Sequence, residues 1–389
     1  MPWRECNKMN ERMKFVLRLE SGEAMSDLCR EFSISRKTGY KIWARFVNKG
    51  LDGLFDESRK PISNPNRTLE STERMILNLK SQHPTWGAEK LREYLLRKYS
   101  NVAFPSKNTF HNILIKNELV KKRRSRVYKS TGTNLRSTEG PNELWCADFK
   151  GQFRMKNREY CYPLTITDHR TRFIIACEAL ESTKEGAAFS VFEAAFEEYG
   201  LPTAIRTDNG VPFCSPNALL GFSKLSVWWM RQGIEFERIT PGHPEENGRH
   251  ERMHLTLKQD LLSDPAKSLL GQQEIFDRFT ETFNLERPHT ALDNETPGSI
   301  YKPSARKYTC TPKEIEYKGC DSVRKVALNG KLHILKNHPI HISDALIKQP
   351  IGITQINENI WRLQFMDIVL GHYDQKENKL SKMKEIVRI

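Results

Sequence analysis

The sequence contains no apolar run that approaches the ~18 residues of a membrane-spanning helix. Its first residues, MPWRECNKMNERMKF, also lack the apolar centre of a signal peptide. We therefore expect a soluble, intracellular protein with no membrane partner.

The eight cysteines include no CxxC pair, the spacing typical of zinc clusters and redox centres. Most of them stand in apolar surroundings, where a free cysteine behaves as a small hydrophobic residue. We expect buried free thiols and neither disulfides nor a zinc cluster.

Acidic residues are outnumbered by basic ones. The chain has 62 Lys and Arg against 48 Asp and Glu, a net charge of +14 over 389 residues. Such an excess of positive charge indicates a polyanionic partner, and nucleic acid is the natural candidate. The length predicts about two to three domains.

Residues 11–48 have the pattern of three helices, the second beginning at Ser26. The turn SIS leads into SRKTGYKIWARFVNKG, whose basic residues Arg36, Lys37 and Lys41 should stay exposed. The packing residues of this third helix should be Tyr40, Ile42, Trp43 and Phe46. We predict a helix-turn-helix DNA-binding domain over residues 1–55, with a plain three-helix bundle as the alternative.

Residues 66–120 resemble a second helix-turn-helix DNA-binding domain, with Ser106 as a helix cap. A basic linker, residues 121–139, follows. Because a dense run of like charge repels itself unless phosphates neutralise it, we predict an arm that tracks DNA. Its predicted DNA contacts are Lys121, Lys122, Arg123, Arg124 and Arg126.

Strand-like runs begin after residue 140. They read LWCADFK, YCYPLTITD, RFIIACEAL, TAIRTD and IEFERI, with helical patterns between the later ones. Three paired strands followed by alternating helices and strands is the order of the ribonuclease-H-like α/β fold, with a mixed five-stranded sheet. In this order Asp148 and Asp208 end neighbouring strands, and a helix brings Glu251 towards them.

That helix follows the Pro- and Gly-rich segment TPGHP. Residues three and four apart share a helix face, so Asn247, Glu251, His254 and Lys258 should form one polar stripe. The opposite face should bury Met253, Leu257 and Leu261. Taken alone, the stripe is more typical of a solvated helix face.

Three blocks, WCADFK, RTDNG and PGHPEENGRHERMHLTLK, resemble the signature blocks of the DDE integrase-core transposases of insertion sequences, which are themselves similar to retroviral integrases. The resemblance covers residues 140–305. It implies that Asp148, Asp208 and Glu251 are the catalytic and metal-binding residues. The intervening gaps are 59 and 42 residues, and the second is longer than in compact retroviral members.

The resemblance also implies a reaction and its partners. Three carboxylates suit two Mg²⁺ or Mn²⁺ ions in one active site, where DNA is nicked and its 3′-hydroxyl joined to another duplex. The DNA partners would be the terminal inverted repeats of a mobile element and a target duplex, with Asn247, His254 and Lys258 as further DNA contacts. We expect at least a homodimer, associated with a bacterial nucleoid in the cytoplasm.

Two alternatives remain at this point. His250-Glu251-Arg252-Met253-His254 fits the HExxH pattern of zinc hydrolases, although no third ligand stands out. The chain could instead be a DNA-binding regulator with an inactive integrase-like core. After Pro303 the chain becomes strand-like again, and we predict a small β-barrel over residues 318–389.

Overall fold

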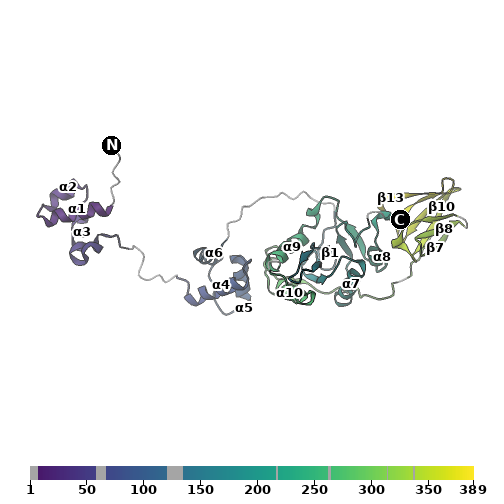
Figure 1. Ribbon diagram of the computed structural model, residues 1–389, viewed down its shortest axis with the longest axis horizontal. Helices are drawn as coiled ribbons and strands as arrows, with labels where there is room; N and C mark the ends of the chain where they lie inside the picture. Colours follow the sequence, from purple (N-terminus) through teal and green to yellow (C-terminus); the bar gives the residue numbers. More distant parts are fainter. Residues whose placement is uncertain are drawn as a thin grey trace. The chain divides into compact units, whose positions relative to one another are not determined.

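The computed structural model describes residues 8–57, 67–120, 135–215, 218–261, 264–312, 314–335 and 338–389. These residues belong to two compact units, Met1–Thr68 and Leu69–Ile389, and Figure 1 shows the order of their elements. The basic arm from Lys121 to Arg126 lies outside the described residues.

The first unit contains helices α1 (Lys8–Glu20), α2 (Met25–Glu31) and α3 (Arg36–Lys49), followed by the short helix η1 (Gly50–Leu54). Ser35 caps α3 by accepting a hydrogen bond from the backbone N–H of Thr38, as its position before the helix leads one to expect. Gly39 is buried where a Cβ atom would collide with the Cys29 sulfur, so α3 can pack closely on α2. This is the predicted arrangement of three helices.

The second unit begins with α4 (Glu70–Gln82), α5 (Ala88–Lys98) and α6 (Lys107–Lys116). Their buried core includes Ile76, Leu91 and Phe110. Ser106 accepts a hydrogen bond from the backbone N–H of Thr109 and so caps α6, which confirms the predicted start of that helix.

A mixed sheet forms the centre of the second unit. Its strands are β1 (Leu144–Phe149), β2 (Phe153–Arg154), β3 (Tyr160–Asp168), β4 (Ile174–Leu180), β5 (Ala204–Thr207) and β6 (Glu235–Arg238). β3 pairs antiparallel with β1, β2 and β4, whereas β1, β5 and β6 run parallel. The five predicted strands are present, and the two-residue β2 is the addition.

Helices cover both faces of this sheet (Figure 1). One face packs against α7 (Glu185–Tyr199) and α8 (Lys224–Arg231), with Trp145 and Phe192 in a shared core. The other packs against α9 (Gly248–Leu261) and α10 (Leu269–Glu281), where Met253 and Leu257 are buried as predicted. Because side chains alternate along a strand, Cys146 and Asp148 face the α9 side.

Short helices complete the unit. These are η2 (Leu219–Gly221), η3 (Pro244–Asn247), η4 (Thr282–Glu286), η5 (Thr290–Leu292) and α11 (Pro297–Ile300). The predicted helix from Glu245 is therefore divided, since η3 is a 3-10 turn and the α-helix begins at Gly248.

The C-terminal strands are β7 (Ser322–Lys325), β8 (Lys331–Leu335), β9 (His338–His341), β10 (Pro350–Asn357), β11 (Ile360–Phe365), β12 (Ile368–Asp374) and β13 (Lys379–Arg388), with η6 (Asp344–Leu346) between β9 and β10. Five of them form an antiparallel sheet in the order β13-β12-β11-β10-β7, and β8 pairs with β9. In the described residues no pairing joins β13 to β7, so this region is an open sheet with a hairpin instead of the predicted closed barrel. Its buried residues continue the hydrophobic core of the central sheet, so it is packed on that domain.

Five of the described cysteines are buried free thiols, as expected, but Cys310 is exposed and Cys320 is partly exposed. None of the described helices combines the length and apolarity that crossing a membrane requires.

Candidate active site

The register of two parallel strands places Asp148 beside Asp208. Ala147 of β1 is paired with Thr207, the last residue of β5. Continuing this register by one residue brings the two aspartates side by side at the carboxyl ends of their strands. The carboxylate of Asp208 accepts a hydrogen bond from the backbone N–H of Gly210 at 3.1 Å, which fixes the turn of the RTDNG block.

The two carboxylates repel each other in a half-buried position. Burial, followed by the charge of Asp208, raises the pKa of Asp148 to about 7. The pKa of Asp208 is also raised, because the carboxyl is partly removed from water. Such a pair lacks positive charge, and its hard oxygen donors are those that Mg²⁺ and Mn²⁺ prefer.

Glu251 affects the ionisation of this pair by its negative charge. It lies on α9 with its side chain exposed, and its negative charge contributes to the raised pKa of Asp148. Over the part of the chain that the structure describes, however, no three His, Cys, Asp or Glu side chains are gathered closely enough to hold one metal ion. The fold thus aligns two carboxylates, while the Glu251 side chain stands near them without closing a three-ligand group.

A buried arginine fixes the segment that leads into α9. Arg206 of β5 forms an ion pair with Glu237 at 2.8 Å. Its other guanidinium nitrogens donate to the backbone carbonyls of Glu246 and Arg136, at 3.1 and 3.0 Å. Arg206 therefore holds η3, and with it the start of α9, against the sheet. Sequence reasoning missed this role, although an arginine two residues before Asp208 in a buried strand was a visible indication.

Two histidines attach α9 to β3, the antiparallel neighbour of β1. The Nε2 atoms of His250 and His254 lie 2.8 and 2.6 Å from the Thr165 hydroxyl oxygen. That hydroxyl donates to the backbone carbonyl of Asp148 at 3.1 Å, so it accepts from both imidazoles. The Thr167 hydroxyl, 2.7 Å from Nδ1 of His250, then donates to it. Burial lowers the pKa of His250 to about 3 and that of His254 to about 2, so both rings are neutral.

These contacts account for the HExxH pattern without zinc. Three of the four imidazole nitrogens are hydrogen-bonded to the threonines, which leaves only Nδ1 of His254 without such a partner. The two histidines are structural residues between α9 and β3, and the arrangement disfavours the zinc hydrolase alternative.

Two of the predicted DNA contacts are buried in this structure. Asn247 and His254 are only 4% and 5% exposed, so they do not share an accessible polar stripe with Glu251 and Lys258. The physical reason is the 3-10 turn before Gly248, which changes the angular position of Asn247, together with the Thr165 hydroxyl, which draws His254 inwards. Lys258 is exposed on α9, as predicted.

In the first unit, the predicted contacts Arg36, Lys37 and Lys41 are exposed on α3. Tyr40 was expected to pack in the core, but it is 59% exposed on the same helix. Its place between basic residues makes it a further candidate for contact with DNA.

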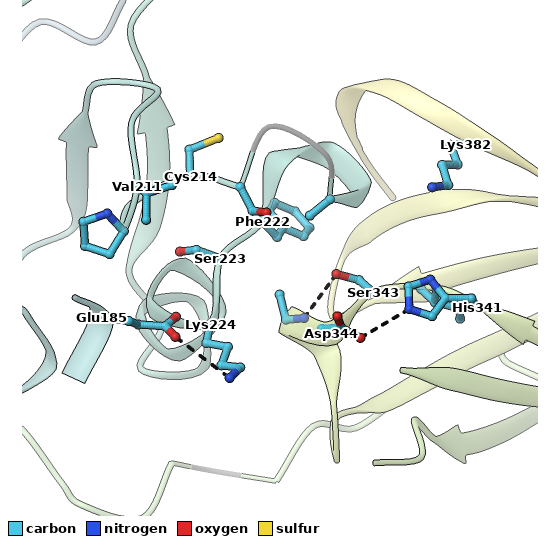
Figure 2. Close-up of a pocket in the computed structure, with 15 residues that line it drawn as sticks. Glu185, Val211, Cys214, Phe222, Ser223, Lys224, His341, Ser343, Asp344 and Lys382 are labelled. Carbon is cyan, nitrogen blue, oxygen red and sulfur yellow. Dashed lines mark hydrogen bonds and ion pairs between the residues drawn. The ribbon is translucent and has the colours of Figure 1, made fainter. Parts of the chain in front are cut away.

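A separate cavity of about 460 Å³ lies between the loop after β5 and the C-terminal region, as Figure 2 shows. Lys224 faces Glu185 at 3.9 Å, and His341 lies 3.2 Å from Asp344 (Figure 2). Lys224 and Asp344 are therefore each paired with a group of the opposite charge or a hydrogen-bonding ring. None of the three candidate carboxylates lines it.

Known protein families match the helical region and the central sheet. Integrase core domains match residues 138–244 and 232–297. A helix-turn-helix domain matches residues 11–62, and a homeodomain-like domain matches residues 38–114. The helical units are thus similar to DNA-binding domains and the central sheet to the integrase core.

Individual relatives are distant. The chain is 22% identical over 253 residues to the uncharacterized 39.2 kDa protein of insertion element IS476 from Xanthomonas euvesicatoria, covering 64% of this chain and 70% of the relative. Solved structures with similarity include the integrase catalytic core domain of HTLV-2 in complex with magnesium, at 18% identity and a TM-score of 0.33, over 42% of this chain and 98% of that one. Another is the intasome of simian T-cell lymphotropic virus in complex with PP2A regulatory subunit B56 gamma, at 14% identity and a TM-score of 0.36, over 81% and 98%.

The family matches confirm the resemblance carried by the three sequence blocks. The chain thus combines regions that match helix-turn-helix domains with a region that matches the integrase core domain, and it is similar to a protein of an insertion element.

Proposed function

We propose that this protein is a DNA transposase that binds the ends of a mobile element and catalyses metal-dependent DNA cleavage and strand transfer. The observation that carries the proposal is the alignment of Asp148 and Asp208 at the ends of adjacent parallel strands, with a raised pKa for both carboxyls. A pair of half-buried carboxylates is unfavourable without a cation, so its presence in an integrase core supports a metal-binding role.

In this proposal Asp148, Asp208 and Glu251 would together hold two Mg²⁺ or Mn²⁺ ions. Bound there, the ions would activate the attacking oxygen and stabilise the leaving oxygen of a DNA phosphodiester. Glu251 is exposed on α9, and its charge acts on Asp148, so its carboxylate would supply the third ligand of the site.

The protein's own residues arrange the reacting groups. Arg206 holds the entry to α9, and Thr165 ties α9 to β3 while it binds the backbone carbonyl of Asp148. Rigid support of this kind keeps the carboxylates near their working positions when DNA binds. Water attack would nick the element's end, and the released 3′-hydroxyl would then attack the target duplex.

The helix-turn-helix domains would supply recognition of the terminal inverted repeats, with basic residues against the phosphates. Because two ends must be joined to one target, the working form would be at least a homodimer. The alternative, a DNA-binding regulator with an inactive core, shares these domains and differs only in the chemistry.

The test is single-turnover strand transfer with a precleaved element end, in Mg²⁺ and in Mn²⁺. Asp148→Asn, Asp208→Asn and Glu251→Gln should each abolish joining while end binding, followed by gel shift, remains. Glu197→Gln, an exposed acid on α7 across the sheet, serves as the matched control and should keep full activity. Full activity in either aspartate variant would overturn the mechanism, and an inactive wild-type protein that binds ends would favour the regulator.

A further inference from the structure

A second cavity, of about 360 Å³, lies beside α9, and five of the side chains that line it are lysine or arginine. The basic residues around it are Lys90, Arg172, Arg249, Arg252 and Arg287. We call it the arginine pocket. Asp148, Asp208 and Glu251 do not line it, so it is distinct from the candidate active site.

Acidic groups do not neutralise this pocket. Asp168 is the one acid among its described lining residues. Its carboxylate accepts hydrogen bonds at 2.7 Å from the backbone N–H groups of Asn142 and Thr171, and from the Thr171 hydroxyl. Asp168 therefore serves the backbone at the end of β3, and the positive charge of the pocket remains largely uncompensated.

Two donors of the pocket are buried without a partner. The Nε atoms of Arg172 and Arg287 are both buried, and no described group accepts from either. Arg287 does reach Asp260 through another nitrogen, at 3.3 Å, whereas Arg172 has no ion-pair partner within the described residues. A buried donor left unpaired costs about 1–3 kcal/mol, so these groups favour a ligand that accepts hydrogen bonds.

The basic groups also repel one another. Burial, followed by the charge of Arg249, lowers the pKa of Arg172 to about 10. Burial and the charges of Lys90 and Arg287 lower the pKa of His289 to about 3, so that this imidazole is neutral. An anion in the pocket would reduce this repulsion and would also accept hydrogen bonds from the unpaired Nε atoms.

We propose that the arginine pocket binds a phosphate group, with the guanidinium groups of Arg172 and Arg252 as its principal donors. Planar guanidinium groups match the oxygens of a phosphate with paired hydrogen bonds, and several of them surround a single small volume here. The phosphate could belong to the DNA backbone or to a free phosphate compound, which share this chemistry. Only the first source rests on the proposed function.

The first measurement is calorimetric titration of the full chain with inorganic pyrophosphate at low salt, without divalent metal. Arg172→Gln and Arg252→Gln should each weaken pyrophosphate binding about tenfold, as expected for loss of a charge-assisted hydrogen bond. Arg278→Gln removes the same charge from an exposed position on α10, outside the pocket, and should leave the affinity unchanged. Arg252 is exposed on α9, so its variant remains informative if Arg172→Gln does not fold.

The second measurement identifies the source of the phosphate. In the Asp148→Asn background, where the DNA stays uncleaved, the slope of log affinity for end DNA against log salt should fall by about 1 for each lost phosphate contact. A smaller slope in the Arg172→Gln and Arg252→Gln variants, together with competition by pyrophosphate, assigns the pocket to the DNA backbone. Weaker pyrophosphate binding with unchanged DNA binding assigns it to a free phosphate compound.

Three results would overturn the proposal: no pyrophosphate binding by the wild-type chain, equal loss in Arg278→Gln, or variants that lose self-association while pyrophosphate binding stays intact. The last would mean that an acidic surface of a second copy occupies the pocket. Pyrophosphate binding requires no strand transfer, so failure here is distinguishable from failure of the transposase proposal.

Discussion

Nδ1 of His254 lies 3.7 Å from a carboxylate oxygen of Asp148. Nε2 of this histidine donates to the Thr165 hydroxyl, so the hydrogen-bonding pattern leaves Nδ1 without a proton. An unprotonated nitrogen beside a carboxylate is unfavourable unless a proton or a cation lies between or near them. Asp148 thus faces a neutral imidazole on the side of α9 and a second carboxylate on the side of Asp208, and neither group supplies positive charge.

The Thr165 hydroxyl should be a positioning group for the active site. Thr165→Val keeps the shape of the side chain but removes the contacts to His250, His254 and the Asp148 carbonyl. We expect strand transfer to fall at least about tenfold, the effect of about 1.4 kcal/mol, with end binding retained. Thr165→Ser keeps the hydroxyl and should restore most of the rate. Single-turnover kinetics of both variants distinguish positioning from general loss of stability, since equal rates in the two would contradict the idea.

Lys258 should hold DNA next to the reacting phosphate. It is exposed on α9, seven residues and about two turns beyond Glu251. Lys258→Ala should therefore reduce strand transfer and lower the salt dependence of end binding by about 1 in log–log slope, without changing the melting temperature. Lys318→Ala, where the side chain is 91% exposed, is the control. Wild-type strand transfer in Lys258→Ala would make the residue an ordinary surface lysine.

Tyr40 should contribute to recognition by α3, because it is exposed between Lys37 and Lys41. Loss of a base or sugar contact in Tyr40→Ala should reduce the preference for end DNA over random DNA by about 1–3 kcal/mol, whereas Lys37→Ala should weaken both affinities similarly. Leu17→Ala alters an exposed apolar residue of α1 and is the control. Competition gel shifts measure the preference, and an unchanged ratio in Tyr40→Ala would exclude this role.

Local patterns predicted the fold well. Each of the five long strands had a β-rich run, and the strand order followed from the sequence of helices and strands. The arrangement of the C-terminal strands, β7 to β13, was harder to predict. Alternation of apolar and polar residues does not distinguish a closed barrel from an open sheet that packs on a neighbouring core. The shared core around Val326 and Leu346 depends on contacts between distant segments, which no local pattern contains.

In the candidate site, too, local patterns predicted some features, whereas others depend on contacts between distant segments. The motifs located Asp148, Asp208 and Glu251, and the strand register is consistent with the first two as neighbours. Helical periodicity placed His254 on one polar stripe with Glu251, but it did not predict that His254 is buried against a threonine on β3. Periodicity could not reveal Thr165, since a threonine in an apolar strand is ordinary until its partner across the fold is known.

The raised pKa of Asp148 predicts an unusual dependence of stability on pH. An unfolded aspartate loses its proton near pH 4, whereas the folded residue retains it up to about pH 7. Between these values the native state binds more protons than the unfolded state, so this residue's contribution makes stability fall as pH rises. Above about pH 7 the unfavourable contribution is complete, and below about pH 4 it is absent.

Asp148→Asn removes that contribution, because an amide does not ionise. Without divalent metal, the variant should melt several degrees above the wild-type protein at pH 8, and the difference should shrink towards pH 4.5. Mg²⁺ should raise the wild-type melting temperature at pH 8, since it binds the folded carboxylates, and should raise that of Asp148→Asn much less. Calorimetry at the two pH values, with Glu197→Gln as the control for a lost surface charge, measures both effects. A variant less stable than the wild type at pH 8 would show that the Asp148 charge is already compensated within the folded chain.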